Sequence, residues 1–123
     1  MFTVTPHANG LIEATLSGFL DVEEVRRYAD IVAPAIRKMV ARHGRYVMLL
    51  DVSDCAIQSQ DVVAAFIQHA ASVPRARRCA VVTGSSIIRM QVRRILQGPA
   101  MRMIADASIA RAWLAEELLA PAH

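Results

Sequence analysis

Residues 47–63 read VMLLDVSDCAIQSQDVV and hold the clearest structural signal in the chain. An apolar run ends at Asp51, as expected of a strand that is buried on both faces. A polar cluster follows, and apolar residues then return at helical spacing, with Ser59 as the expected N-cap. We interpret the cluster as a turn at a candidate docking site, between a buried strand over 45–53 and a helix.

Two strands are expected near the start of the chain. FTVTP at 2–6 and LIEATLSG at 11–18 both alternate apolar and polar residues. Asn9-Gly10 between them is a strong hairpin signal, because both central positions of such a turn favour positive φ. The sequence therefore predicts an antiparallel pair.

A long helix should connect this hairpin to the buried strand. Asp21 is a good N-cap, Glu24 completes a capping box, Leu20 and Val25 suit a hydrophobic staple, and Gly44 should end the helix. Pro34 inside it predicts a bend, because proline removes a backbone donor. One apolar stripe repeats at spacings of three and four residues: Val22, Val25, Ala29, Val32, Ile36 and Met39.

Strands and helices continue to alternate after residue 59. In chain order we expect a helix closed by Pro74, a strand over 78–84, a helix over 85–97 stopped by Gly98-Pro99, a strand over 101–105 and a helix over 107–119 capped by Asp106 or Ser108. On the helix closed by Pro74, the residues expected to face inward are Val62, Val63, Phe66, Ile67 and Ala70. On the last helix they are Ile109, Trp113 and Leu114. The order β-β-α-β-α-β-α-β-α predicts an α/β fold in a single domain, 1–123, with a mixed, mostly parallel sheet and four helices.

Composition limits the class of protein. The chain has 123 residues, of which 54% are apolar and 20% charged, enough for one core and unlike a disordered segment. No run approaches the ~20 apolar residues of a membrane span, and no secretory signal is recognisable. Two cysteines form no disulfide framework, so we expect a cytoplasmic protein.

Charge is unevenly distributed. Residues 62–105 hold seven arginines and no acid. Such a block can attract an anionic partner, although a solvated basic surface is the simpler interpretation. Nucleic acid is not expected, because no recognition motif is present and aromatic residues are only 5% of the chain.

No catalytic residue, metal site or cofactor is predicted. Cys55 follows a strand, but a nucleophile needs a base, and none of the four histidines is expected beside it: His7, His43, His69 and His123. Asp51, Asp54 and Asp61 lack the spacing and the glycine of a calcium loop. A loop cysteine and ordinary helix-terminal acids explain these residues better.

The predicted third helix has a core stripe and a mixed outer face. The stripe contains Ile88, Val92, Ile95 and Leu96, whereas Ile87 and Met90 fall outside it among arginines. Two isolated exposed side chains or a surface for a partner or lipid would explain this arrangement. At the start of this helix, Ser85 and Ser86 with Arg89 form either an ordinary N-cap or an anion-binding site.

Several short motifs together resemble a known family. LSGFLDVEEV, VMLLDVSD and the closing ARAWL resemble the STAS superfamily of anti-sigma-factor antagonists, and within it the SpoIIAA-like, STAS/SEC14-like bacterial proteins. The resemblance covers roughly the whole chain. It implies a mixed sheet of four or five strands with helices and a non-enzymatic role, either in regulating a partner protein or in binding an apolar ligand.

The same resemblance suggests that a phosphorylation switch is lost or altered. Antagonist-type members carry a phosphorylatable Ser or Thr in an Asp-Ser-Ser-Gly-like turn at the start of the second helix. Here that position falls on Gln60 or Asp61, and valine replaces the glycine. Ser59 would be the acceptor only if the register slips, and Asp61 either mimics a phosphate charge or is a plain helix-terminal acid.

We therefore predict a small binding module that meets an acidic protein or a second copy of itself through the loop over 52–61 and the third helix. The predicted contact residues are Ser53, Asp54, Ser59, Gln60, Asp61, Arg89 and Arg93. The alternative is a SEC14-like carrier of a lipid or other apolar molecule. Its pocket would open at the bend near Pro34 or beneath the third helix, with Ile87 and Met90 as ligand contacts.

Overall fold

A computed structural model describes residues 1–120. Residues 121–123, which include His123 and the end of the predicted domain, lie outside the described residues. The elements are β1 (Phe2–Pro6), β2 (Leu11–Gly18), α1 (Val22–His43), β3 (Val47–Cys55), α2 (Gln60–Ala71), β4 (Arg78–Val82), α3 (Ser86–Ile95), β5 (Met101–Ile104) and α4 (Ala107–Leu119). The predicted α/β class and element order are confirmed.

The five strands form one mixed sheet in the order β1-β2-β3-β4-β5. The β1–β2 pair is antiparallel and every later pair is parallel, as expected when helices connect successive strands. The turn between β1 and β2 differs from the two-residue turn that Asn9-Gly10 predicts. Of these two residues only Gly10 adopts a positive φ, of 100°. The side chain of Asn9 instead accepts a hydrogen bond from the Leu11 amide at 3.3 Å.

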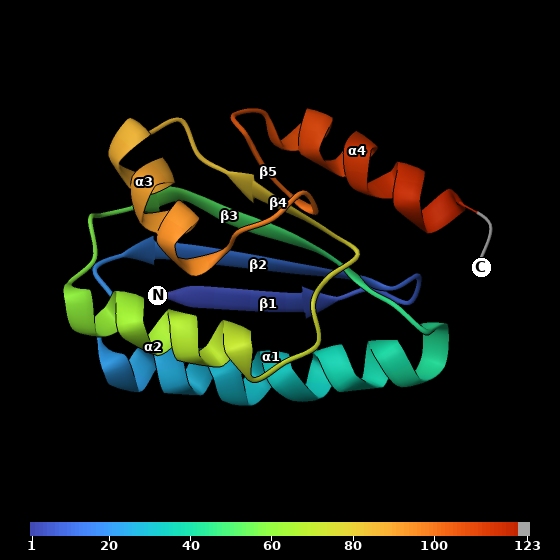
Figure 1. Cartoon of the computed structure of the whole chain (residues 1–123), viewed down its shortest axis with the longest axis horizontal. Coiled ribbons are helices and arrows are strands. Elements are labelled where there is room, and N and C mark those ends of the chain that lie inside the picture. The colour runs from blue at the N-terminus through green and yellow to red at the C-terminus, as the bar shows by residue number, and fades with distance from the viewer. Residues whose placement is uncertain (121–123) are drawn as a thin grey trace.

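The two faces of the sheet are covered unequally. Figure 1 shows α1 and α2 side by side on one side of the sheet and α4 on the other. The larger core cluster joins α1, α2 and α3 to one face through residues such as Val32, Val62 and Ile88. The smaller cluster joins α4 to the opposite face through Ala110, Trp113 and Leu114. Three helices therefore share one face, and the candidate site forms where they meet the strand ends.

The predicted caps Asp21 and Ser59 are confirmed, and where two residues were possible the structure has Ser85 as the cap of α3 and Asp106 as the cap of α4. Side chains of Asp21, Ser59, Ser85 and Asp106 each accept a hydrogen bond from a backbone amide in the first turn of their helices. Gly44 ends α1 with a φ of 76°, in the left-handed region that glycine adopts without strain. The four helix starts therefore follow from local sequence.

Other local expectations need correction. The carboxylate of Glu24 pairs with the Met1 amino group at 2.7 Å rather than with the helix start, because β1 brings Met1 alongside. Helix α1 runs from Val22 to His43 with Pro34 inside it, as predicted, and a bend at Pro34 stays a prediction. Ile109 and Ile67 were expected to face inward, but they are exposed, and Ala110 takes the buried place on α4.

Strand β3 is shifted by two residues relative to the predicted strand over 45–53. It runs from Val47 to Cys55, so Asp54 as well as Ser53 lies in the strand and only residues 56–59 connect it to α2. Thr15 of β2 pairs with Asp51, but Ser17 pairs with Asp54, so β3 carries one extra residue, a bulge. Helix α3 ends at Ile95, before Gly98. Within residues 1–120, no helix is both long and apolar enough to span a bilayer.

Candidate functional site

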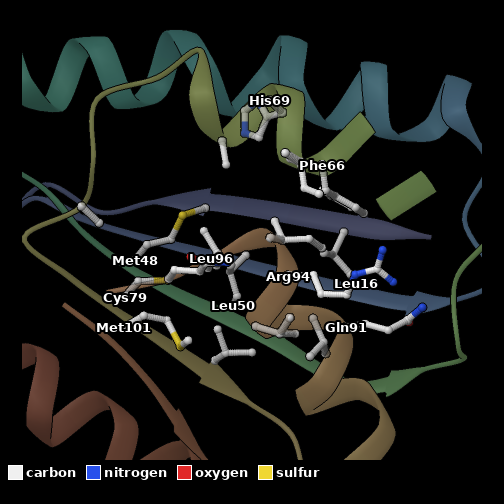
Figure 2. A pocket seen from close by; sticks show the side chains of 18 of the residues that line it. Leu16, Met48, Leu50, Phe66, His69, Cys79, Gln91, Arg94, Leu96 and Met101 are labelled. Atoms are coloured by element: carbon white, nitrogen blue, oxygen red, sulfur yellow. The ribbon is translucent and has the colours of Figure 1, made fainter. Parts of the chain in front are cut away.

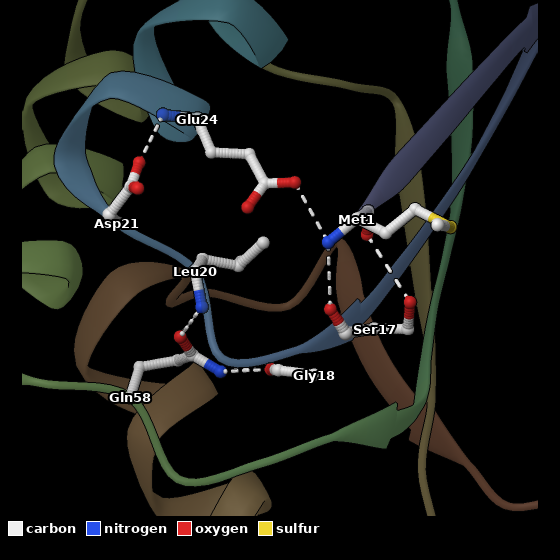
Figure 3. A network of polar contacts seen from close by, with 7 residues as sticks. All are labelled: Met1, Ser17, Gly18, Leu20, Asp21, Glu24 and Gln58. Carbon is white, nitrogen blue, oxygen red and sulfur yellow. Dashed lines mark hydrogen bonds and ion pairs between the residues drawn. The ribbon is translucent and has the colours of Figure 1, made fainter.

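The candidate site lies at the edge of the sheet where the parallel strands end. Three segments meet there: the β2–α1 connection, the 56–59 loop after β3, and helix α3. Gln58 joins the first two. Its side chain accepts a hydrogen bond from the Leu20 amide at 2.8 Å and donates to the carbonyls of Gly18 and Ala56 at 2.9 and 2.7 Å, as Figure 3 shows in part.

Gln91 joins the third segment to the other two. The Gln58 amide donates to Oε1 of Gln91, and Nε2 of Gln91 donates to the Gln58 carbonyl, both at 2.9 Å. One glutamine backbone is thus held by the side chain of another, 33 residues away. Because all these donors and acceptors are satisfied in a partly buried place, the three segments hold one fixed arrangement.

This arrangement displays large apolar side chains. Phe19 follows Gly18 and is 80% exposed, and Ile57 precedes Gln58 and is 52% exposed. Ile87 is equally exposed and lies four residues before Gln91, so it shares the side of α3 that faces the 56–59 loop. We call Phe19, Ile57 and Ile87 the apolar edge. Sequence analysis missed Phe19 and Ile57, because nothing local indicates that a turn residue stays uncovered.

The predicted contact residues around the polar cluster have mainly structural partners. The Ser53 hydroxyl donates to Asp51 at 2.7 Å, and the Ser59 hydroxyl accepts from the Val62 amide at 3.3 Å. Asp54, Gln60 and Asp61 are exposed beside them. The structure therefore places the cluster next to the apolar edge.

The arginines of α3 point elsewhere. Arg89 and Arg93 lie two residues before and after Gln91, so at ~100° per residue they occupy the opposite side of the helix. Neither has a carboxylate within 4.0 Å among residues 1–120. Met90 is 64% exposed, between the two sides. The predicted surface is thus divided between the strand-end edge and the outer face of α3.

The predicted anion site at the start of α3 has part of its polar capacity in use. The Ser85 hydroxyl accepts from the Ile88 amide, and the Ser85 amide donates to Thr83, both at 3.2 Å. Ser86 is exposed, and Nε of Arg89 is buried without a partner among residues 1–120. An N-cap accounts for Ser85, and anion binding stays a prediction.

The thiol of Cys55 is poorly suited to nucleophilic chemistry. Burial raises its pKa to about 11, with smaller effects from nearby charges, so it stays protonated at neutral pH. The pKa of His69 is lowered, also by burial. Among residues 1–120, no group of three His, Cys, Asp or Glu side chains is arranged to hold a metal ion.

A pocket of about 660 Å³ opens beneath α2 and α3, on the face of the sheet that they cover. Its walls are mostly apolar and come from strands β2 to β5 and from both helices (Figure 2). Ile87 and Met90, the predicted ligand contacts, are not among the lining residues. The wall of α3 is instead the predicted core stripe with Gln91 and Arg94, so the stripe faces a cavity.

Comparisons with known proteins agree with this architecture. The SpoIIAA-like family model matches residues 11–115, which is most of the chain. No curated protein matches the chain by sequence. Among solved structures, an uncharacterised protein from Shewanella loihica PV-4 with a SpoIIAA-like fold superposes with a TM-score of 0.68 at 14% identity, over 93% of this chain and 92% of that one.

Two anti-sigma factor antagonists also share the fold. One, from Mycobacterium paratuberculosis, has a TM-score of 0.63 at 10% identity and covers 94% of this chain and 93% of its own. The other, SpoIIAA in its unphosphorylated form, has a TM-score of 0.59 at 16% identity, over 94% and 98%. Identities this low establish the shared fold alone. The family-model match over residues 11–115 establishes that the chain belongs to the SpoIIAA-like family.

Proposed function

We propose that this chain is a non-enzymatic regulatory module that binds a partner protein at the apolar edge. The observation that carries the proposal is the hydrogen-bonded arrangement around Gln58, which holds Phe19 and Ile57 in exposed positions. Aromatic and aliphatic side chains on a rigid support lose little conformational entropy on binding. The shared fold with anti-sigma factor antagonists supports a protein as the partner.

The chemistry of the partner follows from the surroundings of the apolar edge. Its centre should be apolar, to cover Phe19, Ile57 and Ile87. Where it extends over the outer face of α3 it should be acidic, because Arg89 and Arg93 have no carboxylate neighbour within the described chain. Charged pairs at such a rim mainly raise association rates, whereas the apolar centre supplies most of the affinity.

A phosphorylation switch is not part of this proposal. The Ser59 hydroxyl caps α2, and the residues that follow it are Gln60 and Asp61. Asp61 lies in the first turn of α2, where a carboxylate is stabilised by the helix dipole without any regulatory role. We propose that binding is constitutive and does not depend on a kinase. The high pKa of the Cys55 thiol argues against nucleophilic catalysis by this residue.

The test compares one surface variant with a matched control. One variant carries Phe19→Ser and Ile57→Ser, and the control carries Ile31→Ser and Ile109→Ser, which are 51% and 59% exposed on other surfaces. Each immobilised protein is exposed to lysate of the source organism, retained proteins are identified by mass spectrometry, and the affinity is then measured with the purified partner. We expect the edge variant to bind at least ~10-fold more weakly and the control to bind normally.

A third variant, Arg89→Glu with Arg93→Glu, tests the acidic character of the partner. It should slow association and make binding less dependent on salt. Sedimentation velocity of the chain alone tests self-association, and a dimer that Phe19→Ser dissociates would make the partner a second copy. Equal loss in the edge variant and the control, or no loss in either, would contradict the proposed surface.

A further inference from the structure

The pocket beneath α2 and α3 exists because α3 stands off the sheet. The helix packs mainly against α2, and Ile88 is its only buried residue. Two further apolar residues of the helix, Val92 and Ile95, are half-buried and line the pocket. Small residues leave the remaining space open: Ala70, Ala71, Ala76, Gly98 and Ala100. Side chains around such a space lose packing contacts, so an occupant of matching chemistry would stabilise the fold.

The pocket has one end with sulfur-containing side chains, near which Arg75 lies beside Gly98, and another end with polar side chains of α3. Figure 2 shows the sulfur-containing side chains of Met48, Cys79 and Met101 at one end, and Gln91 and Arg94 at the other. Leu16, Leu50 and Leu96 lie between or beside them. An elongated molecule with one polar head would match this distribution along its length.

The charges around the pocket have one sign. No Asp or Glu lines it, whereas Arg75 and Arg94 do. Neither arginine has a carboxylate within 4.0 Å among residues 1–120. His69 adds no charge at neutral pH, since burial lowers its pKa. Arg94 lies three residues after Gln91 on the same side of α3, so its guanidinium stands at the polar end.

We propose that this pocket binds a molecule with an unbranched apolar body and a single anionic head, with the head at Arg94 and the body directed toward Met48 and Met101. The volume of about 660 Å³ falls within the range of sites for small ligands. Its apolar walls offer few partners to ordered water, which favours an apolar occupant. A carboxylate or phosphate at Arg94 would form a charge-assisted hydrogen bond. This site is separate from the apolar edge and does not depend on the docking role.

The probe is dodecanoate, used below its micelle concentration, with 1-dodecanol and dodecyltrimethylammonium as the neutral and cationic analogues. The chain is labelled with ¹³C-methyl methionine, and each methyl signal is assigned by single Met→Leu substitution. We expect the signals of Met48 and Met101 to shift on titration. Met1 and Met90 are 75% and 64% exposed and do not line the pocket, so their signals should stay in place.

Arg94→Gln tests the head-group contact, and Arg93→Gln is its matched control on the same helix. Arg93 is exposed and does not line the pocket. We expect Arg94→Gln to weaken dodecanoate binding about 10-fold, the usual effect of losing a hydrogen bond to a charged group, without changing dodecanol binding. Arg93→Gln should bind both probes as the unaltered chain does. Melting temperatures confirm that each variant is folded.

Three results would overturn the proposal. Dodecanoate could leave the Met48 and Met101 signals unmoved up to its solubility limit, shift Met1 and Met90 as much, or bind no better than dodecyltrimethylammonium. An anionic ligand with an apolar body could come from a membrane or from solution, and vesicles of phosphatidylglycerol distinguish these two sources. Extraction of phosphatidylglycerol would assign the site to a membrane lipid, and binding of dodecanoate without extraction would assign it to a soluble acid. Because none of these readouts uses a partner protein, failure here would leave the docking proposal standing.

Discussion

The side-chain amide of Gln91 pairs with the backbone of Gln58 through two hydrogen bonds of 2.9 Å. This pair connects α3, which forms one wall of the pocket, to the loop that displays Ile57. A change in the position of α3 would therefore be transmitted to the apolar edge through these two hydrogen bonds between Gln91 and Gln58. The pair is also part of the support on which both proposed surfaces depend.

Gln91→Ala should destabilise the chain. It removes both bonds and leaves the Gln58 amide and carbonyl without partners in a partly buried place, which costs about 1–3 kcal/mol of unfolding free energy. Gln68→Ala is the matched control, because Gln68 is exposed on α2 and its side chain has no hydrogen-bond partner among residues 1–120. Urea denaturation measures both. Equal stability of the two variants would show that water replaces the Gln91 amide at no cost.

Ser59→Ala should cost about 1 kcal/mol of stability, the usual effect of losing an N-cap. Its hydroxyl accepts from the Val62 amide at 3.3 Å, and alanine would leave that amide without a partner. Ser86→Ala is the control, because Ser86 is exposed in the first turn of α3 and makes no such bond. Thermal unfolding followed by circular dichroism would distinguish them, and a Ser59→Ala protein as stable as the control would remove the structural role assigned to this hydroxyl.

Features that depend on neighbours in sequence could be predicted from the chain. Asp21, Ser59, Ser85 and Asp106 were recognisable as caps because the bond that each makes closes within three residues. The order of strands and helices followed from their apolar periods for the same reason. The strand register was harder to predict, because the bulge between Asp51 and Asp54 of β3 arises from pairing with β2, which no local sequence pattern records.

The candidate surfaces depended on contacts between distant segments. The stripe of Val92 and Ile95 was correctly placed on the inner side of α3, but only the position of the whole helix determines whether that side meets a core or a cavity. Ile109 was expected to face inward, but its side chain is exposed. On α4 the buried stripe runs instead through Ala110, Trp113 and Leu114, which meet the sheet.

Cys55 should react slowly with alkylating reagents. Because burial raises the pKa of its thiol to about 11, the thiolate is only about 1 part in 10⁴ at pH 7. The rate of modification by iodoacetamide in a Cys79→Ala background should keep rising with pH beyond about pH 9. A plateau already reached at neutral pH would indicate an activated thiol and would contradict the non-enzymatic proposal.

Two arginines lie against the ring of Trp113: the guanidinium carbons of Arg78 and Arg102 are 5.0 Å and 4.7 Å from the ring centre. Arg102 is exposed, so Arg102→Ala should cost about 0.5–1 kcal/mol and alter the fluorescence of this single tryptophan. Arg37→Ala on α1, exposed and unpaired among residues 1–120, is the control. Unchanged fluorescence in Arg102→Ala would mean that the guanidinium does not rest on the ring in solution.

His69 should make the fold less stable in acid. Burial lowers its pKa below the ordinary value of 6.5, and its ring packs edge-on against Tyr28 with the centroids 5.5 Å apart. Below about pH 6.5 the unfolded chain therefore binds a proton that the folded chain resists, and the free energy of unfolding falls as pH decreases through that range. His69→Gln removes this contribution. Urea denaturation at about pH 5 and about pH 7.5 should give a smaller difference for His69→Gln than for the unaltered chain, and identical differences would mean that His69 titrates alike in both states.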